Sequence, residues 1–288
     1  MKVLLICGMH RSGTSCIANE LANAGVPISD TLLSADEGNV KGYFEDPRII
    51  AIHDQILSSL GSNWMDPAPL PSDWLGHVCS QGFDNLIKSY LDGFGQDLPV
   101  LLIKEPRISR LLALWLRVCD QAGHEVAILH VGRNLIEVSD SLWRRNHIPL
   151  VHGIQLWARY NLDVVVQGAD VSHAILDIRQ FIREPDVLAA ICEKLEIPIA
   201  HAENFGSQTE PDLLNEGPQD IGAWSLSQIL SEQILQGSEF SSLENLKAIY
   251  DLCGGDMIAV ERRHYAVVHS TLWTVVEELK QIKNSQVQ

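Results

Sequence analysis

The chain is short of cations and has no long apolar run. It contains 21 Lys and Arg residues against 37 Asp and Glu, a formal net charge of −16 over 288 residues. Nucleic acids and anionic membranes attract proteins through clustered cations that neutralise phosphates, so this balance argues against either as a general partner. No stretch approaches the roughly 18 apolar residues of a membrane span. The run after Lys2 is too short for a signal peptide, because His10 and Arg11 end it.

Cysteine pairs and metal-ligand patterns are also missing. The six cysteines form no Cys-x-x-Cys pair, and most lie in apolar segments, where cysteine behaves as a small hydrophobic residue. We therefore expect a reduced, cytoplasmic compartment. No cluster of His, Cys and Asp has the spacing of a metal site, so we expect no metal in the function.

Hydrophobic residues make up 46% of the chain, which is enough for a full α/β core. Four apolar runs are each followed by a helical pattern, and this alternation predicts a parallel sheet with crossover helices. The runs cover residues 3–7, 100–103, 126–131 and 174–178. Other expected elements are helices at 14–24, from Pro47 to about Gly61, and at 73–94, with a loop at 62–72.

The composition changes after residue 200 and suggests a division of the chain. We expect a core over residues 1–202 and a polar linker or lid over 203–223, which contains Pro211 and Pro218. Residues 224–288 show helical periodicity without a convincing strand. We expect this region to pack on the core or to cover a substrate site.

The first apolar run ends in a glycine-bracketed loop, residues 8–13, that opens a helix. A strand, such a loop and a helix N-terminus together direct backbone N–H groups at an anion, usually a phosphate. The spacing Gly8-x4-Gly13 is that of a P-loop, but Thr14 stands where the Lys that reaches the β- and γ-phosphates should be. Arg11 is the only cation within the loop. The loop is therefore predicted to bind a phosphate group with no γ-phosphate beyond it.

Two motifs resemble those of sulfotransferases that use 3′-phosphoadenosine 5′-phosphosulfate (PAPS). Arg-Ser-Gly-Thr-Ser at residues 11–15 is similar to the family's 5′-phosphosulfate loop. Residues 126–146 resemble its 3′-phosphate motif, in which an Arg at a strand end and a Ser eight residues later hold the 3′-phosphate; here these are Arg133 and Ser141. The segments 42–46 and 104–107 are similar to turns of the bacterial branch.

The resemblance implies a P-loop NTPase-like sulfotransferase fold and a soluble enzyme. Such an enzyme transfers a sulfuryl group from PAPS to a hydroxyl of a small or medium-sized acceptor and releases adenosine 3′,5′-bisphosphate. The residues that the resemblance assigns to cofactor binding are Arg11, Ser12, Gly13, Thr14, Ser15, Arg133, Ser141 and Arg145. Lys104 would lie near the bridging oxygen, and His10 would be a second donor to the sulfuryl group.

The base that removes the acceptor proton is expected to be a carboxylate, because the Lys-x-His of the cytosolic branch is absent and position 106 is Pro. Glu45 in Gly-Tyr-Phe-Glu-Asp is the first choice and Glu105 the second, followed by Glu37 and His10. Asp46 is better explained as a helix cap.

Several residues near the motifs also have ordinary structural explanations. Arg107 would equally suit a surface helix start, and Arg144 and Arg145 would suit a helix C-terminus. The aromatic residues of the following helices are more often core than adenine platform; they are Trp143, Trp157 and Tyr160. The family has Tyr and Glu where this chain has Ile178 and Arg179, so the aromatic and acidic side chains of that family motif are absent here.

Two other functions remain open from the sequence. A P-loop kinase or NTPase is favoured by Gly8-x4-Gly13 and by residues 174–177, which resemble a Walker B strand. A non-catalytic protein that binds the nucleotide without turnover is the second. Sugar, lipid, polyketide and peptide acceptors are not distinguished by the composition, and the oligomeric state is open. A late basic contact to the 3′-phosphate, from Arg262 and Arg263, is less expected than a solvated helix face.

Overall fold

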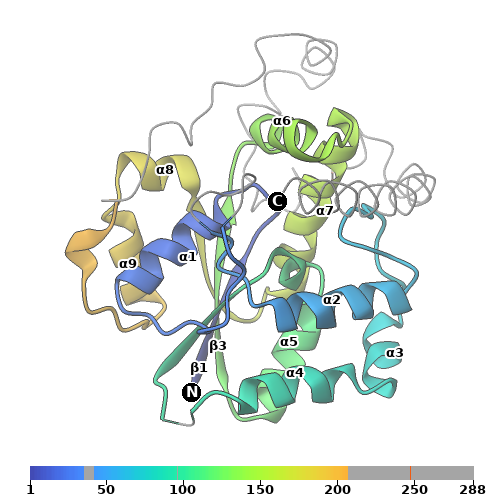
Figure 1. The fold of residues 1–288 in the computed structure, drawn as a ribbon, viewed down its shortest axis with the longest axis horizontal. Coiled ribbons are helices and arrows are strands. Elements are labelled where there is room, and N and C mark those ends of the chain that lie inside the picture. Colours follow the sequence, from blue (N-terminus) through green and yellow to red (C-terminus); the bar gives the residue numbers. More distant parts are fainter. Residues whose placement is uncertain (36–41, 96, 207–246, 248–288) are drawn as a thin grey trace, which may run out of the picture.

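The computed structural model describes residues 1–35, 42–95, 97–206 and Lys247. These residues form a four-stranded parallel sheet in the order β2-β1-β3-β4, with helices on both faces (Figure 1). The strands are β1 (Lys2–Cys7), β2 (Val100–Lys104), β3 (Glu125–Gly132) and β4 (Ser172–Asp177). The predicted α/β class and the parallel sheet flanked by helices are confirmed.

Strand β1 explains why the first apolar run has no polar alternation. Successive side chains of a strand point to opposite faces of the sheet. Leu4 and Ile6 enter the core on one face, whereas Val3 and Leu5 enter the core on the other. Because helices cover both faces, every position of the strand favours an apolar residue.

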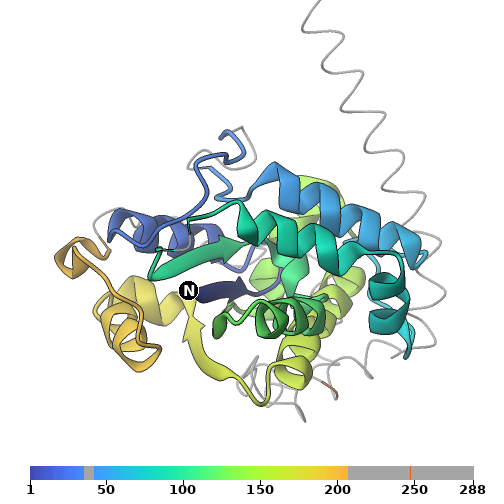
Figure 2. The same ribbon diagram turned by 90° about the horizontal axis from the view of Figure 1, so that it is seen from below.

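The helices form two layers and an upper pair (Figures 1 and 2). One layer packs against the face of Leu4 and contains α1 (Thr14–Asn23), α8 (Ile178–Arg183) and α9 (Val187–Lys194). The other layer contains α2 (Pro47–Ser59), α3 (Trp74–Ser80), α4 (Phe83–Asp92) and α5 (Leu112–Gln121). The pair α6 (Leu135–Asn146) and α7 (Leu150–Gln167) packs together, and short 3₁₀ turns lie at η1 (Pro106–Ser109) and η2 (Ala202–Asn204).

The strand register aligns the carboxyl ends of all four strands at one edge of the sheet. Cys7 pairs with His130 and Gly132 pairs with Asp177, while Lys104 ends β2 beside β1. The chain leaves β1 toward β2 on one side and returns to β3 on the other. Ligands of open α/β sheets bind outside the carboxyl ends at such a switch point, which here lies between β1 and β3.

Helix boundaries confirm one prediction and correct another. Asp46 caps α2, because its Oδ1 accepts a hydrogen bond of 2.9 Å from the N–H of Arg48, and Pro47 is the first helical residue. The single helix predicted over 73–94 is wrong. It is divided into α3 and α4 at Gly82, whose φ of +82° is left-handed and ends a right-handed helix.

The expected C-terminal organisation lies largely outside the described residues. Of the predicted linker, residues 203–206 are described, and the N–H of Gly206 donates to Glu20 Oε2 at 2.9 Å. The region 224–288, apart from Lys247, and with it Arg262 and Arg263, lies outside the described residues. In the part of the chain that is described, no helix has the length and apolar character needed to cross a membrane.

Gly8 lets the loop after β1 lie directly against β3. Its φ is +150°, and a Cβ atom at this position would lie 2.3 Å from the carbonyl oxygen of Val131. We predict that Gly8→Ala lowers the free energy of unfolding by about 1–3 kcal/mol, because the backbone must move to relieve the contact. Urea denaturation measures this change.

Gly76→Ala is the matched control. Gly76 lies within α3 and a Cβ atom there meets nothing within 4 Å, so alanine should raise the free energy of unfolding by about 0.5–1 kcal/mol. Equal stability of the two variants would contradict the close approach of the loop to β3.

Candidate functional site

The glycine-bracketed loop lies at the switch point and is held there by its neighbours. The N–H of Gly8 donates to Ser109 Oγ at 2.8 Å, and that hydroxyl donates back to the Gly8 carbonyl at 3.2 Å. Gly13 precedes α1 with a φ of +92°, and a Cβ atom there would lie 2.6 Å from Cγ1 of Ile178. Packing on both sides therefore fixes the loop, as a preorganised phosphate cradle requires.

The loop meets the second motif through a direct hydrogen bond. Arg11 Nε donates to Ser141 Oγ at 2.8 Å, although the two residues are 130 positions apart. Burial, together with the positive charges of Arg145 and Arg133, lowers the pKa of Arg11 to about 10. Because these neighbouring cations disfavour one another, an anion bound among them would be stabilised.

Arg133 is fixed by the helix that follows it. Its Nε forms an ion pair of 2.7 Å with Glu137 Oε2, one turn along α6. Its carbonyl accepts a hydrogen bond of 2.9 Å from the indole N–H of Trp157. Asn134 caps α6 by accepting from the N–H of Ile136 at 2.9 Å. The strand end and the helix start thus both orient this arginine.

Lys104 connects the loop to Glu45. Its ammonium donates to Ser15 Oγ at 2.9 Å, to the Tyr43 carbonyl at 3.0 Å and to the Glu45 carboxylate. Both partners of the Lys104–Glu45 ion pair are buried, with side-chain exposures of 2% and 8%. The structure therefore brings together a predicted cation, a predicted base and the start of α1.

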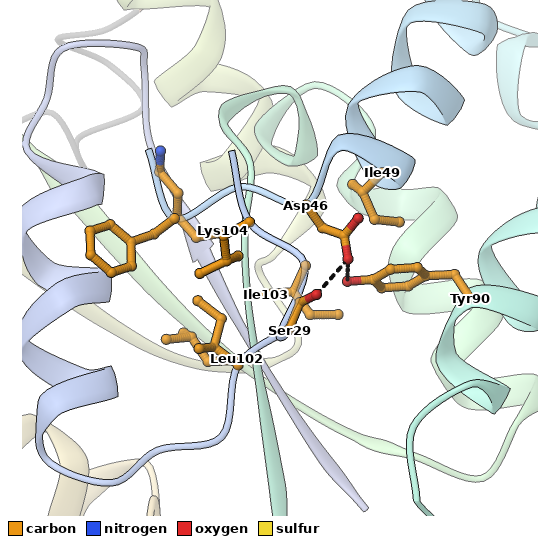
Figure 3. A pocket seen from close by; sticks show the side chains of 10 residues that line it. Ser29, Asp46, Ile49, Tyr90, Leu102, Ile103 and Lys104 are labelled. Atoms are coloured by element: carbon orange, nitrogen blue, oxygen red, sulfur yellow. Dashed lines mark hydrogen bonds between the residues drawn. The ribbon is translucent and has the colours of Figure 1, made fainter. Parts of the chain in front are cut away.

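A small cavity below Lys104 belongs to the framework of α2 (Figure 3). Ser29 Oγ and the Tyr90 hydroxyl donate to Asp46 Oδ2 at 2.6 and 3.3 Å. Burial by itself raises the pKa of Asp46, but hydrogen bonds from Arg48 and Ser29 outweigh it and lower that pKa. Figure 3 shows the Lys104 ammonium directed away from this carboxylate, and it donates to Ser15 Oγ instead.

Glu105 is fully buried and both of its oxygens have partners. Arg107 Nη1 donates to Oε1 at 2.5 Å, and His53 Nδ1 contacts Oε2. Because His53 Nε2 accepts a hydrogen bond of 2.9 Å from the Trp115 indole, Nδ1 carries the proton that it donates to Glu105. Arg107 also forms an ion pair of 2.9 Å with Asp54.

This network favours a structural role for Glu105. Burial alone would raise its pKa, yet the charge of Arg107 and the hydrogen bond from His53 hold that pKa well below its usual range. Arg107 is only 8% exposed, so its interpretation as a surface helix-start residue is wrong. Lys104, which precedes Glu105 in the sequence, contacts Glu45 instead.

His10 lies between two aromatic rings at the edge of the loop. Its ring centroid is 4.6 Å from that of Trp64 and 5.9 Å from that of Tyr160. Burial and the positive charge of Arg107 lower the pKa of His10 well below its usual value, so the imidazole is neutral at pH 7. Its Nε2 is buried and has no hydrogen-bond partner among the described residues.

The backbone carbonyl groups of the loop that carries Trp64 form hydrogen bonds with side chains of α7 and with Arg110, which follows η1. Trp64 O accepts from the Tyr160 hydroxyl at 2.8 Å, and Met65 O contacts His152 Nε2 at 2.7 Å. The next carbonyls are held by Arg110, which donates to Asp66 O at 2.6 Å and to Ala68 O at 2.7 Å. This rigid loop forms a wall beside His10.

Other predicted residues occupy more ordinary positions. The N–H of Ser12 donates to Met9 O at 3.1 Å and its Oγ is fully buried, so it is not directed at the outer side of the loop. Arg145 Nε donates to Asn146 Oδ1 at 2.7 Å, and exposed Arg144 pairs with Asp140 at 2.6 Å. The remaining positions are Thr14, which is buried, Trp157 and Tyr160, which are core residues, and Trp143, which is 51% exposed.

Sequence reasoning missed His53, Asp54 and Trp64. His53 occupies a buried position on the apolar face of α2. A polar histidine on an otherwise apolar helix face was the only feature of the sequence that could have indicated its buried partner. Trp64 lies in a segment that composition identifies merely as a loop. Within the described ranges, no group of three or more His, Cys, Asp and Glu residues could hold a metal ion.

Two solved structures align with most of the chain. One is a sulfotransferase domain from the Synechococcus PCC 7002 olefin synthase, with 17% identity and a TM-score of 0.46 over 86% of this chain and 87% of that one. The other is a sulfotransferase domain from the curacin biosynthetic pathway, with 16% identity and a TM-score of 0.43 over 88% and 98%. No family model and no curated protein matches the chain. At these similarities neither alignment assigns a residue or an activity.

The buried Glu105 network predicts an acid-sensitive contribution to stability. The pKa of Glu105 is lower in the folded chain than the value of about 4.3 typical of unfolded chains. Its stabilising effect is therefore full above that value and is lost as the pH falls below it toward the folded pKa. We predict that Glu105→Gln costs about 3–5 kcal/mol at pH 7, because Arg107 stays buried without its partner.

Urea denaturation between pH 7 and pH 3 measures the difference between wild type and Glu105→Gln. The difference should shrink as the pH falls below about 4. Glu125→Gln is the control, since the Glu125 side chain is 79% exposed and should cost little at any pH. A difference that stays constant with pH would show that Glu105 is not a stabilised carboxylate.

Proposed function

We propose that the chain is a PAPS-dependent sulfotransferase that transfers a sulfuryl group to a hydroxyl acceptor. The Arg11–Ser141 hydrogen bond carries this proposal. It joins the motif that resembles the 5′-phosphosulfate loop to the motif that resembles the 3′-phosphate site, at the point where an open α/β sheet binds ligands. Arg133 and Arg145 add their charges beside it.

The residues present suit a nucleotide with phosphate groups at both ends. Gly8 and Gly13 approach β3 and Ile178 too closely for side chains, and the loop between them leads into the start of α1, where a 5′-phosphate would bind. Arg133 and Ser141 would hold the 3′-phosphate. When bound, PAPS supplies an activated sulfuryl group.

The proposed catalytic groups lie around the same loop. Lys104, which already contacts Ser15 Oγ, would stabilise negative charge on the departing 5′-phosphate oxygen. Glu45 would accept the proton of the acceptor hydroxyl as its oxygen attacks sulfur. Neutral His10 would donate a hydrogen bond from its unpartnered face. Cations and one base suffice for this in-line transfer.

The kinase alternative finds less support. Thr14 replaces the lysine of a P-loop. The carboxylate of Asp177, which would be the Walker B acid, accepts a hydrogen bond of 2.7 Å from the N–H of Arg179 and caps α8. A binding protein without turnover keeps the same pocket, so only an activity measurement separates it from an enzyme.

Ligand-dependent melting tests the proposed nucleotide. Adenosine 3′,5′-bisphosphate without magnesium should raise the melting temperature, whereas ATP with magnesium should not. Arg133→Ala and Ser141→Ala should weaken bisphosphate binding at least about tenfold. The control is Arg144→Ala on the same helix, because Arg144 is exposed and pairs with Asp140. Unchanged dissociation constants in the first two variants would rule out the assignment.

Turnover tests the proposed base. Glu45→Gln should lower the rate of bisphosphate release from PAPS by about 10²–10⁴-fold, with the dissociation constant of the bisphosphate unchanged. The assay follows bisphosphate release over a panel of phenolic, sugar and aliphatic alcohol acceptors. An unaffected rate removes Glu45 from the mechanism, and no release from wild type with any acceptor favours the binding protein.

A further inference from the structure

Arg179 occupies a position where the resembled family has an acidic residue, and the structure brings it to the same edge as the phosphate loop. It follows Ile178, whose side chain packs on Gly13. Its backbone N–H is fixed by Asp177 Oδ1 at 2.7 Å. Helices α8 and α6 both lie in the upper part of Figure 1, and Arg179 forms an ion pair with Glu137 of α6, within the 3′-phosphate motif.

Glu137 joins Arg179 to Arg133. One carboxylate oxygen pairs with Arg133 Nε at 2.7 Å and the other with Arg179 Nη2. The Glu137 side chain is only 5% exposed, whereas that of Arg179 is 42% exposed. Burial lowers the pKa of Arg179, and the positive charges of Arg133 and Arg183 lower it as well. Two guanidinium groups therefore share one buried carboxylate and keep an excess of one positive charge.

Charge balance shows why this excess matters. A phosphate monoester carries about −1.5 to −2 charges at pH 7. Arg133 alone would be neutralised by Glu137 and would leave the phosphate charge to Arg11, which contacts Ser141, and to the nearby Arg145. Arg179 restores one positive charge, so that Arg11, Arg133 and Arg179 together exceed Glu137 by two. Guanidinium groups suit this role because each binds two phosphate oxygens at once.

We propose that Arg179 binds the 3′-phosphate of the nucleotide together with Arg133, and that Glu137 is a positioning residue that aligns the two guanidinium groups. This inference rests on the proposed function and adds a binding residue to it. It also makes the 3′-phosphate, rather than the 5′-phosphate, the group that Arg179 recognises. Affinity for a nucleotide without the 3′-phosphate is then independent of Arg179.

The test compares two nucleotides on the full chain by titration calorimetry at low salt. Arg179→Ala should weaken binding of adenosine 3′,5′-bisphosphate by about tenfold to hundredfold. Binding of adenosine 5′-monophosphate should change by less than about twofold. Arg179→Gln, which keeps a hydrogen-bond donor beside Glu137 without the charge, should show the same selective loss.

Arg183→Ala is the matched control. Arg183 lies one turn further along α8, and its Nε donates to the Arg179 carbonyl at 3.2 Å. This variant removes an arginine from the same helix and should leave both dissociation constants within about twofold. Equal loss for both nucleotides in Arg179→Ala and Arg179→Gln, or no loss for either, would overturn the inference.

Arg133→Ala separates this inference from the proposed function. Selective loss of bisphosphate affinity in Arg133→Ala together with unchanged affinity in Arg179→Ala would overturn only the role of Arg179. Wild-type protein that binds the bisphosphate no more tightly than the monophosphate would overturn the proposed function itself. Selective loss in both variants supports both.

Discussion

Pairing of buried carboxylates with cations is the constraint on which this site depends. Three glutamates lie at the carboxyl edge of the sheet with little exposure, and each has its own cation. Glu45 contacts Lys104, Glu105 contacts Arg107, and Glu137 contacts Arg133 and Arg179. A buried charge without a partner is strongly destabilising. The pairs therefore fix the positions of the cations that the loop needs.

The three ion pairs differ in how completely the surrounding residues enclose the carboxylate. Glu105 is enclosed by His53 and Arg107, and Trp115 closes the network on the far side. Glu45 shares the ammonium of Lys104 with Ser15 Oγ and the Tyr43 carbonyl, beside the start of α1. Glu137 is divided between two guanidinium groups. The pair of Glu105 and Arg107 supports the fold, while the other two pairs lie where the proposed nucleotide would bind.

Rigidity on the opposite side of the loop comes from hydrogen bonds to the backbone. The carbonyls near Trp64 are held by side chains of α7 and by Arg110. Because those donors are themselves buried, Trp64 is fixed against His10. The two rings thus hold a neutral imidazole whose buried Nε2 has no hydrogen-bond partner among the described residues.

Local sequence patterns predicted the fold. Which cation pairs with which carboxylate depends on contacts between side chains and could not be predicted from those patterns. The strands, the cap at Asp46 and the glycine loop follow from residues close in sequence, so periodicity and spacing were sufficient. The cation that pairs with Glu105 was not predictable in this way, because Lys104 and Arg107 are both near it in sequence. The two differ only in the direction in which the backbone places their side chains. Lys104 ends β2 and points toward Ser15, whereas Arg107 turns back within η1. The helix break at Gly82 depended on a backbone angle that composition does not reveal.

Selective binding of one anion by an acidic protein, as proposed above, requires cations that act only at short range. A net charge of −16 repels extended polyanions at distances up to about 10 Å at moderate salt. The arginines near Ser141 act at hydrogen-bond distance, where bidentate geometry and partial burial strengthen them. A compact nucleotide would reach these groups after losing little to long-range repulsion, whereas a nucleic acid would bring many other phosphates near a protein of negative net charge.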